Sequence, residues 1–204
     1  MSTLTTANQL TLIRLLLVPT FVILIVYGFT GWALATFVLA GLTDALDGLI
    51  ARWSGQKTTL GAWLDPVADK LLLVTTFIVL TLPDMGLTNR LPVWITVVVI
   101  SRDVVILLTV AIVNLAVGPR TFRPSVYGKA ATAIYVITAV VTLYGNYIGR
   151  VLGLVDVCVY ASLAITLISS VHYLGYARRV ADQPEDVAPG SGEAPESSPS
   201  EGAR

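Results

Sequence analysis

Residues 42–70, LTDALDGLIARWSGQKTTLGAWLDPVADK, join the second and third long apolar stretches of the chain. The polar break SGQKT in their middle predicts two helices that form a hairpin. On the first helix Asp44 and Asp47 are three residues apart, and on the second Asp65 and Asp69 are four apart. At either spacing the two side chains share one face of the helix. The hairpin therefore brings four carboxylates together.

Similar apolar stretches recur along the chain. Hydrophobic residues make up 55% of the sequence and charged residues 13%, with a mean hydropathy of +0.78, which favours a membrane protein. A span needs about 20 apolar residues, and a lone strand in lipid would leave its backbone groups unpaired. We therefore expect an all-α integral membrane protein with a short N-terminal interfacial segment, TTANQLTLIR, and six transmembrane helices. They are predicted at 12–28, 32–53, 59–82, 92–116, 125–147 and 151–177.

The net charge of zero conceals two oppositely charged parts. Residues 1–180 contain twelve basic and seven acidic residues, whereas the last 24 residues contain six acids and one base. We expect 1–180 to be the membrane domain and 181–204, rich in Pro, Gly, Ser and Glu, to be a disordered acidic tail. The lone Cys158 excludes an intramolecular disulfide and a Cys-based zinc site. The sequence lacks the clustered basic face of a soluble nucleic-acid binder.

The placement of Lys and Arg predicts the orientation in the membrane. One set of helix ends is basic, and the opposite breaks hold only Arg90 and Arg150. By the positive-inside rule, both termini and the acidic hairpin face the cytoplasm. The basic set consists of Arg52, Lys57, Arg120, Arg123, Lys129, Arg178 and Arg179.

Four of the seven acids in residues 1–180 lie on the hairpin, and they need compensating positive charge. An ionised side chain at the centre of a membrane helix costs about 2.5–3.5 kcal/mol on an insertion scale. Arg52 and Lys70 are too few to neutralise four carboxylates. Hard divalent cations such as Mg²⁺ or Mn²⁺ bind carboxylate oxygens, and zinc is disfavoured because no His or Cys is near. The sequence thus predicts a divalent-metal site.

Small residues line the acidic faces. Gly48 and Ala51 each lie four residues after an Asp of the first pair, and Gly61 lies four before Asp65. A glycine inside a helix costs up to about 1 kcal/mol relative to Ala, which suggests close approach of a ligand. Packing between membrane helices is the simpler explanation of any single glycine. It does not explain the carboxylates.

The hairpin carries a family resemblance. Asp44-x-x-Asp47-Gly48-x-x-Ala51-Arg52, then eight residues, then Gly61-x-x-x-Asp65-x-x-x-Asp69, resembles the complete signature of the CDP-alcohol phosphotransferases. The resemblance extends over residues 1 to about 180 through NQLTLIRLLLVP, ISRDVVILL and PSVYGKAATA, and leaves out the acidic tail.

That resemblance implies transfer of a phosphatidyl group from CDP-diacylglycerol to an acceptor hydroxyl, with release of CMP. It implies two Mg²⁺ or Mn²⁺ ions, a homodimer and a location in a bacterial cell membrane. The implied ligands of the first ion are Asp44, Asp47 and Asp65, and those of the second are Asp47, Asp65 and Asp69. Asp69 also resembles the general base for the acceptor hydroxyl. The implied contacts to the nucleotide are Gly48, Ala51, Arg52, Thr58 and Gly61, with Asn8 and Thr11 as weaker candidates.

Basic residues outside the hairpin are candidates for binding the acceptor. Arg102 lies with Asp103 inside an apolar stretch, where it either serves function or forms a mutual structural ion pair. Lys129, with Arg120 and Arg123 nearby, is predicted to bind the acceptor phosphate. The competing explanation for these three residues is a positive-inside loop.

The identity of the acceptor is less determined than the reaction. The runs around the signature look most like the glycerophospholipid branch, and Ser101-Arg102-Asp103 is closer to the cardiolipin-synthase type, which uses phosphatidylglycerol. The alternative is a phosphatidylglycerophosphate synthase acting on glycerol-3-phosphate. A cation-coupled transporter would also hold membrane carboxylates, but should repeat them in a second half. A non-catalytic scaffold would leave the signature unexplained.

Overall fold

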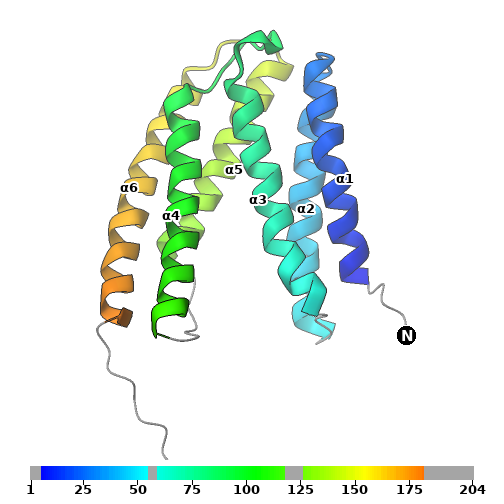
Figure 1. Ribbon diagram of the computed structural model, residues 1–204. Coiled ribbons are helices and arrows are strands. Elements are labelled where there is room, and N and C mark those ends of the chain that lie inside the picture. Colours follow the sequence, from blue (N-terminus) through cyan, green and yellow to red (C-terminus); the bar gives the residue numbers. More distant parts are fainter. Residues whose placement is uncertain (1–5, 55–58, 118–125, 182–204) are drawn as a thin grey trace, which may run out of the picture.

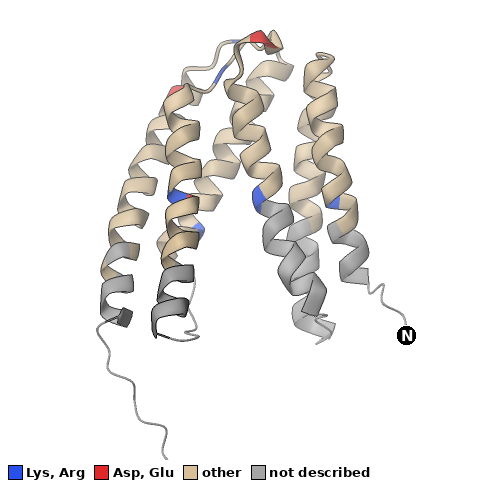
Figure 2. Ribbon diagram, viewed as in Figure 1, with Lys and Arg blue, Asp and Glu red and all other residues tan. Residues whose placement is uncertain are grey.

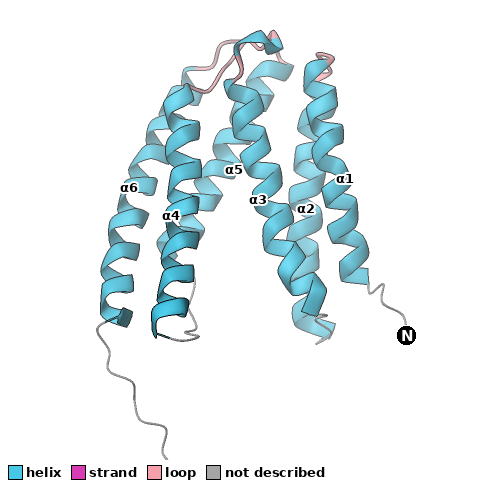
Figure 3. Ribbon diagram, viewed as in Figure 1, coloured by secondary structure: helices cyan, strands magenta, loops and turns pink. Residues whose placement is uncertain are grey.

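The computed structural model describes the backbone of residues 6–54, 59–117 and 126–181, and the side chains of 12–43, 70–109, 126–173 and 175. Within these ranges every regular element is a helix (Figures 1 and 3). The elements are α1 (Thr6–Val26), α2 (Thr30–Ser54), α3 (Thr59–Thr81), the 3₁₀ turn η1 (Pro83–Met85), α4 (Val93–Val117), α5 (Val126–Tyr147) and α6 (Gly153–Ala181). The prediction of six long helices is confirmed in the described part of the chain.

The largest boundary difference is at the start of α1. The helix begins at Thr6 rather than at residue 12, so most of the predicted interfacial segment is continuous with it. Residues 6–18 contain no Gly or Pro to interrupt the helix, and the first breaker is Pro19. At the other end α6 runs to Ala181, four residues beyond the prediction. The tail from residue 182, predicted to be disordered, lies outside the described residues.

The helices form two groups. α1, α2 and α3 pack on one another, α4 and α5 pack on α6, and α2 contacts α5 between the groups. Figure 1 shows the groups close together at the end with the α3–α4 and α5–α6 loops, which we call the loop end. They diverge toward the end where α1 begins and α6 ends, which we call the terminal end. The chain therefore enters and leaves the bundle at the same end.

The outer surface of the bundle is apolar. Each long helix exposes at least one large aliphatic side chain that is 41–68% accessible: Leu16, Leu39, Ile78, Leu107, Ile137 and Leu167. Two described helical segments, Val126–Tyr147 and Gly153–Tyr173, are long and apolar enough to cross a membrane. The shorter apolar segments Leu12–Val26, Thr30–Thr43 and Lys70–Thr81 belong to helices whose remaining side chains are not described. Such a surface suits a lipid environment.

Aromatic rings pack at the centre of the bundle. Phe77 of α3 meets Tyr135 of α5 edge to face, with ring centroids 5.9 Å apart. Tyr135 in turn donates to or accepts from the Thr166 hydroxyl of α6 at 2.5 Å. One turn along, the Thr138 and Ser162 hydroxyls lie 2.9 Å apart. Hydroxyls paired across the α5–α6 seam satisfy their polar groups and allow the helices to approach closely.

Two asparagines fasten the loop end. The Asn89 backbone N–H donates to Asn146 Oδ1 at 2.6 Å, and Asn146 Nδ2 donates to the Asn89 carbonyl at 3.0 Å. The Asn89 side chain donates to the Arg150 carbonyl and accepts from the Leu152 N–H. These four bonds join the α3–α4 loop to the end of α5 and the α5–α6 loop, so both helix groups are held together there.

Candidate active site at the terminal end

The four predicted carboxylates lie on the two helices that meet at the terminal end. Asp44 and Asp47 are in the C-terminal half of α2, and Asp65 and Asp69 are in the N-terminal half of α3. The chain passes from Ser54 to Thr59 between them, as the predicted hairpin requires. The side chains of these acids lie outside the described residues, and the nearest described side chains are one helical turn away.

One turn deeper in the bundle is a cavity of about 130 Å³. We call it the Arg14 cavity. It lies among α1, α2, α3 and α5, and its lining consists of Arg14, Phe37, Ala40, Gly41, Leu72, Leu73, Thr132 and Val136. A Cβ built at Gly41 would have no heavy atom within 4 Å, which agrees with open space there.

The lining places four predicted site residues at one level. On each of the four helices, a lining residue lies three positions from a predicted site residue, close to one helical turn. The pairs are Thr11 and Arg14, Asp44 and Gly41, Asp69 and Leu72, and Lys129 and Thr132. In every pair the predicted residue is nearer the terminal end, because α2 runs antiparallel to α1, α3 and α5. The backbone thus places these four positions about one helical turn from the Arg14 cavity, on its terminal side.

Arg14 is a functional candidate that the sequence analysis missed. Its side chain is 1% exposed and lines a mostly apolar cavity, one turn from the level of the acidic pairs. This buried guanidinium places positive charge one helical turn from the backbone positions of Asp44 and Asp69. The available signal was an ionisable residue inside the first apolar stretch, which indicates function by default.

A chain of polar contacts joins α3, α4 and α6. Lys70 Nζ lies 2.7 Å from Asp103 Oδ2, and Arg102 Nη1 lies 2.7 Å from Asp103 Oδ1. Arg102 Nη2 donates to Ser169 Oγ on α6 at 2.9 Å. The mutual ion pair considered for Arg102 and Asp103 is therefore present. Arg102 as an acceptor contact stays a prediction, and the sequence analysis did not foresee the link to Lys70.

The described basic residues lie in two regions of the bundle. Figure 2 shows basic residues near the middle of α1, α3 and α4 and on the first turn of α5, and two more, Arg90 and Arg150, in the loops of the loop end. Lys129 is exposed on the first turn of α5, as an acceptor contact requires. Arg120, Arg123 and Thr58 lie outside the described residues. The other predicted nucleotide contacts have a described backbone only: Asn8 on α1, Gly48, Ala51 and Arg52 on α2, and Gly61 on α3.

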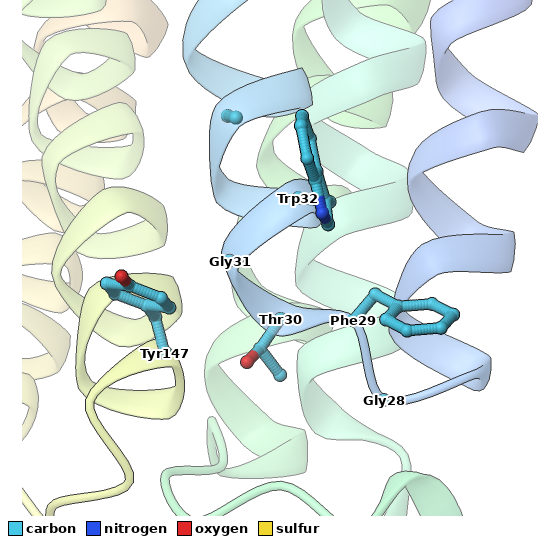
Figure 4. A pocket seen from close by; sticks show the side chains of 7 residues that line it. Gly28, Phe29, Thr30, Gly31, Trp32 and Tyr147 are labelled. Atoms are coloured by element: carbon cyan, nitrogen blue, oxygen red, sulfur yellow. The ribbon is translucent and has the colours of Figure 1, made fainter.

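A larger hollow of about 540 Å³ lies at the loop end (Figure 4). Gly28, Phe29, Thr30, Gly31, Trp32, Ala35 and Tyr147 line it. This lining contains no acidic or basic side chain, so it does not suit a nucleotide diphosphate. Exposed Trp and Tyr at a helix end are typical of the membrane–water interface.

The described side chains contain no group of three or more His, Cys, Asp or Glu residues that could hold a metal ion. The side chains of the predicted metal ligands are not among the described ones, so this absence does not concern them. These ligands are Asp44, Asp47, Asp65 and Asp69. As a donor set, four carboxylates fit a hard divalent cation.

The apolar outer surface and the long apolar helices define a helical membrane protein. The chain belongs to the CDP-alcohol phosphatidyltransferase family, whose model matches residues 4–168. It is therefore a membrane-bound transferase of phospholipid biosynthesis. The cation-coupled transporter considered from the sequence has no support from this match.

The chain is similar to relatives that carry two different enzyme names. A probable phosphatidylglycerophosphate synthase of Mycobacterium tuberculosis is 33% identical over 85% of this chain and 81% of its own length. A CMP-forming cardiolipin synthase of Rattus norvegicus is 35% identical over 83% of this chain and 61% of its own length. A cardiolipin synthase of the same type from Streptomyces coelicolor is 38% identical over 63% and 60%, respectively.

Proposed function

We propose that the protein transfers a phosphatidyl group from CDP-diacylglycerol to a glycerol-phosphate-type acceptor hydroxyl and releases CMP. One observation carries the proposal: the Arg14 cavity lies one helical turn from four predicted site residues on four different helices, on the side toward the loop end. These residues are Thr11, Asp44, Asp69 and Lys129. This shared position along four helices supports one site in which residues predicted to contact nucleotide, metal and acceptor act together.

The carboxylates of Asp44, Asp47, Asp65 and Asp69 would hold two Mg²⁺ or Mn²⁺ ions. When bound, such ions polarise a pyrophosphate and neutralise the charge that develops on departing CMP. The chain itself supplies binding and proton transfer. Arg52, with its planar guanidinium, would bind the diphosphate of the donor. Asn8 and Thr11 on α1 would approach the nucleotide from the side opposite the hairpin.

Asp69 would accept the proton of the acceptor hydroxyl. A carboxylate in this role must lie within hydrogen-bond reach of the hydroxyl. Lys129, three residues before the cavity-lining Thr132, would bind the acceptor phosphate with Arg102, Arg120 and Arg123. Arg102 already donates to Asp103 and Ser169, so among the described residues Lys129 is the stronger candidate for the phosphate contact.

For the acceptor we propose phosphatidylglycerol, because Ser101-Arg102-Asp103 resembles the cardiolipin-synthase type. Glycerol-3-phosphate is the second candidate, and it is favoured by the coverage of the mycobacterial phosphatidylglycerophosphate synthase. We further propose that all six long helices span a bacterial cell membrane as a homodimer, with the terminal end in the cytoplasm. The excess of Lys and Arg in the sequence segments that connect the helices at that end supports this orientation.

The test offers purified protein CDP-diacylglycerol with phosphatidylglycerol in one reaction and glycerol-3-phosphate in another, and identifies the lipid product by mass spectrometry. We expect cardiolipin from the first reaction and little product from the second. Phosphatidylglycerophosphate from the second alone would assign the other acceptor. No CMP release with either acceptor would refute the proposed function.

A further inference from the structure

We propose that Asp103 is a positioning residue of the phosphatidyl-transfer site: its ion pair with Lys70 fixes α3 against α4 so that Asp65 and Asp69 face the acidic pair of α2. The inference rests on the proposed function. It assigns a role to two residues that the reaction itself does not use.

Both oxygens of the Asp103 carboxylate are engaged. Oδ2 pairs with Lys70 on α3 and Oδ1 pairs with Arg102 on its own helix, each at 2.7 Å. Arg102 is held in turn by Ser169 of α6, whose side chain is 1% exposed. The Arg102 side chain is 8% exposed and Asp103 is 17% exposed. Asp103 is therefore held from the α6 side and offers a fixed partner to α3.

Lys70 lies at a point where its position controls the site. It directly follows Asp69, and successive residues of a helix are about 100° apart around its axis. With Lys70 directed at α4, residue 69 lies a quarter-turn or more away from that direction, on a different face of α3. A Lys70 ammonium without Asp103 would be free to approach the neighbouring carboxylates and compete with metal ions for them.

The pair acts where the two helix groups diverge. Near the loop end, the hydroxyls of Thr81 on α3 and Thr96 on α4 lie 2.6 Å apart. Lys70 is eleven residues from Thr81, about 16 Å along the helix at 1.5 Å per residue. Two ties so far apart constrain the rotation and the tilt of α3 relative to α4, in addition to the packing of α3 on α1 and α5. The Lys70 side chain is 47% exposed, and such a pair contributes little to stability, so its main consequence is geometric.

The experiment compares Asp103→Asn, Lys70→Gln and the double variant in the full-length protein. For Asp103→Asn we expect kcat to fall about 10–100-fold, as for residues that orient metal ligands, with the KM of the acceptor nearly unchanged. The Mg²⁺ concentration for half-maximal rate should rise. The double variant should be no slower than the slower single variant, because the two residues act through one interaction.

Two controls separate positioning from damage to the fold. Asp103→Glu keeps the charge and should recover most of the lost kcat, while Asp156→Asn makes the same acid-to-amide change on an exposed residue at the loop end and should change nothing. A second readout needs no turnover: Mg²⁺ should raise the unfolding temperature of the substrate-free wild type more than that of Asp103→Asn.

Three results would overturn the inference. Asp103→Asn could have the same kcat and Mg²⁺ dependence as Asp156→Asn, or the reductions in kcat from the two single changes could multiply in the double variant. The third result is a change confined to the KM of the acceptor. The last would make the network part of acceptor binding. If the wild type released no CMP, the proposed function would fail. The Mg²⁺-induced shift in unfolding temperature would still decide whether Asp103 positions the carboxylates.

Discussion

Gly41 and Gly145 differ in the space around them, and this difference sets the expected effect of a Gly→Ala change on stability. A Cβ at Gly41 would have no heavy atom within 4 Å, whereas a Cβ at Gly145 would lie 2.7 Å from Asn89 Nδ2. We expect Gly41→Ala to raise the free energy of unfolding by about 0.5–1 kcal/mol, the helix-propensity difference. Gly145→Ala should lower it by about 1–3 kcal/mol through overpacking.

Thermal unfolding of both variants in the same detergent measures the contrast directly. The two glycines lie inside helices and receive the same methyl group, so each serves as the control for the other. Equal shifts in the same direction would contradict the account of the cavity.

Some single residues could be assigned a role from the sequence, and others could not. The acids of the hairpin stand out because carboxylates are rare in the apolar body, and their spacing places each pair on one face. The partner of Lys70 was not predictable, since it depends on how α3 and α4 are rotated against each other. Arg14 could be recognised as unusual but not as the lining of a cavity, because four separate helices form that lining.

At the scale of elements, Asn146 connects α5 to the α3–α4 loop. The change Asn146→Ala would leave the backbone N–H and carbonyl of Asn89 without their hydrogen-bond partners. Asn89 is only 5% exposed, so water cannot readily replace them. We expect a loss of about 1–3 kcal/mol in unfolding free energy, the usual cost of unpaired buried groups. Asn146→Asp keeps the acceptor oxygen but sets a second acceptor against the Asn89 carbonyl, so it should be destabilising as well.

Unfolding of these variants in detergent, with Tyr144→Phe as a control on an exposed side chain of the same helix end, checks the prediction. Stability of Asn146→Ala equal to that of Tyr144→Phe would mean that the bonds at the loop end do not hold the helix groups together.

Helix existence followed from the length of the apolar stretches, and most helix boundaries followed from the Gly, Pro and charged residues between them. The start of α1 did not, because TTANQLTLIR is less apolar than the residues after it yet contains no helix breaker. The lower hydropathy of this stretch thus misled the prediction of where the helix begins. The pairing of Asn89 with Asn146 was also hidden, since the residues are 57 positions apart.

At the scale of the whole molecule, two groups of helices are held together at the loop end by the bonds between Asn89 and Asn146 and diverge toward the terminal end. The net charge of zero gives no hint of a polar site. The uneven distribution of acids along the sequence does, because it predicts such a site at the α2–α3 hairpin. The relation of that site to α1 and α5 required the structure.

The most direct test of the central claim measures CMP release from CDP-diacylglycerol by the wild type, by Asp69→Asn and by Asp84→Asn, with Mg²⁺ and after its removal by a chelator. Asp84 is an exposed acid at the loop end and serves as the matched control. We expect Mg²⁺-dependent release by the wild type and by Asp84→Asn, and a rate at least about 100-fold lower for Asp69→Asn, within the range for loss of a general base. Turnover by Asp69→Asn at the wild-type rate, or release that persists without divalent ions, would contradict the account.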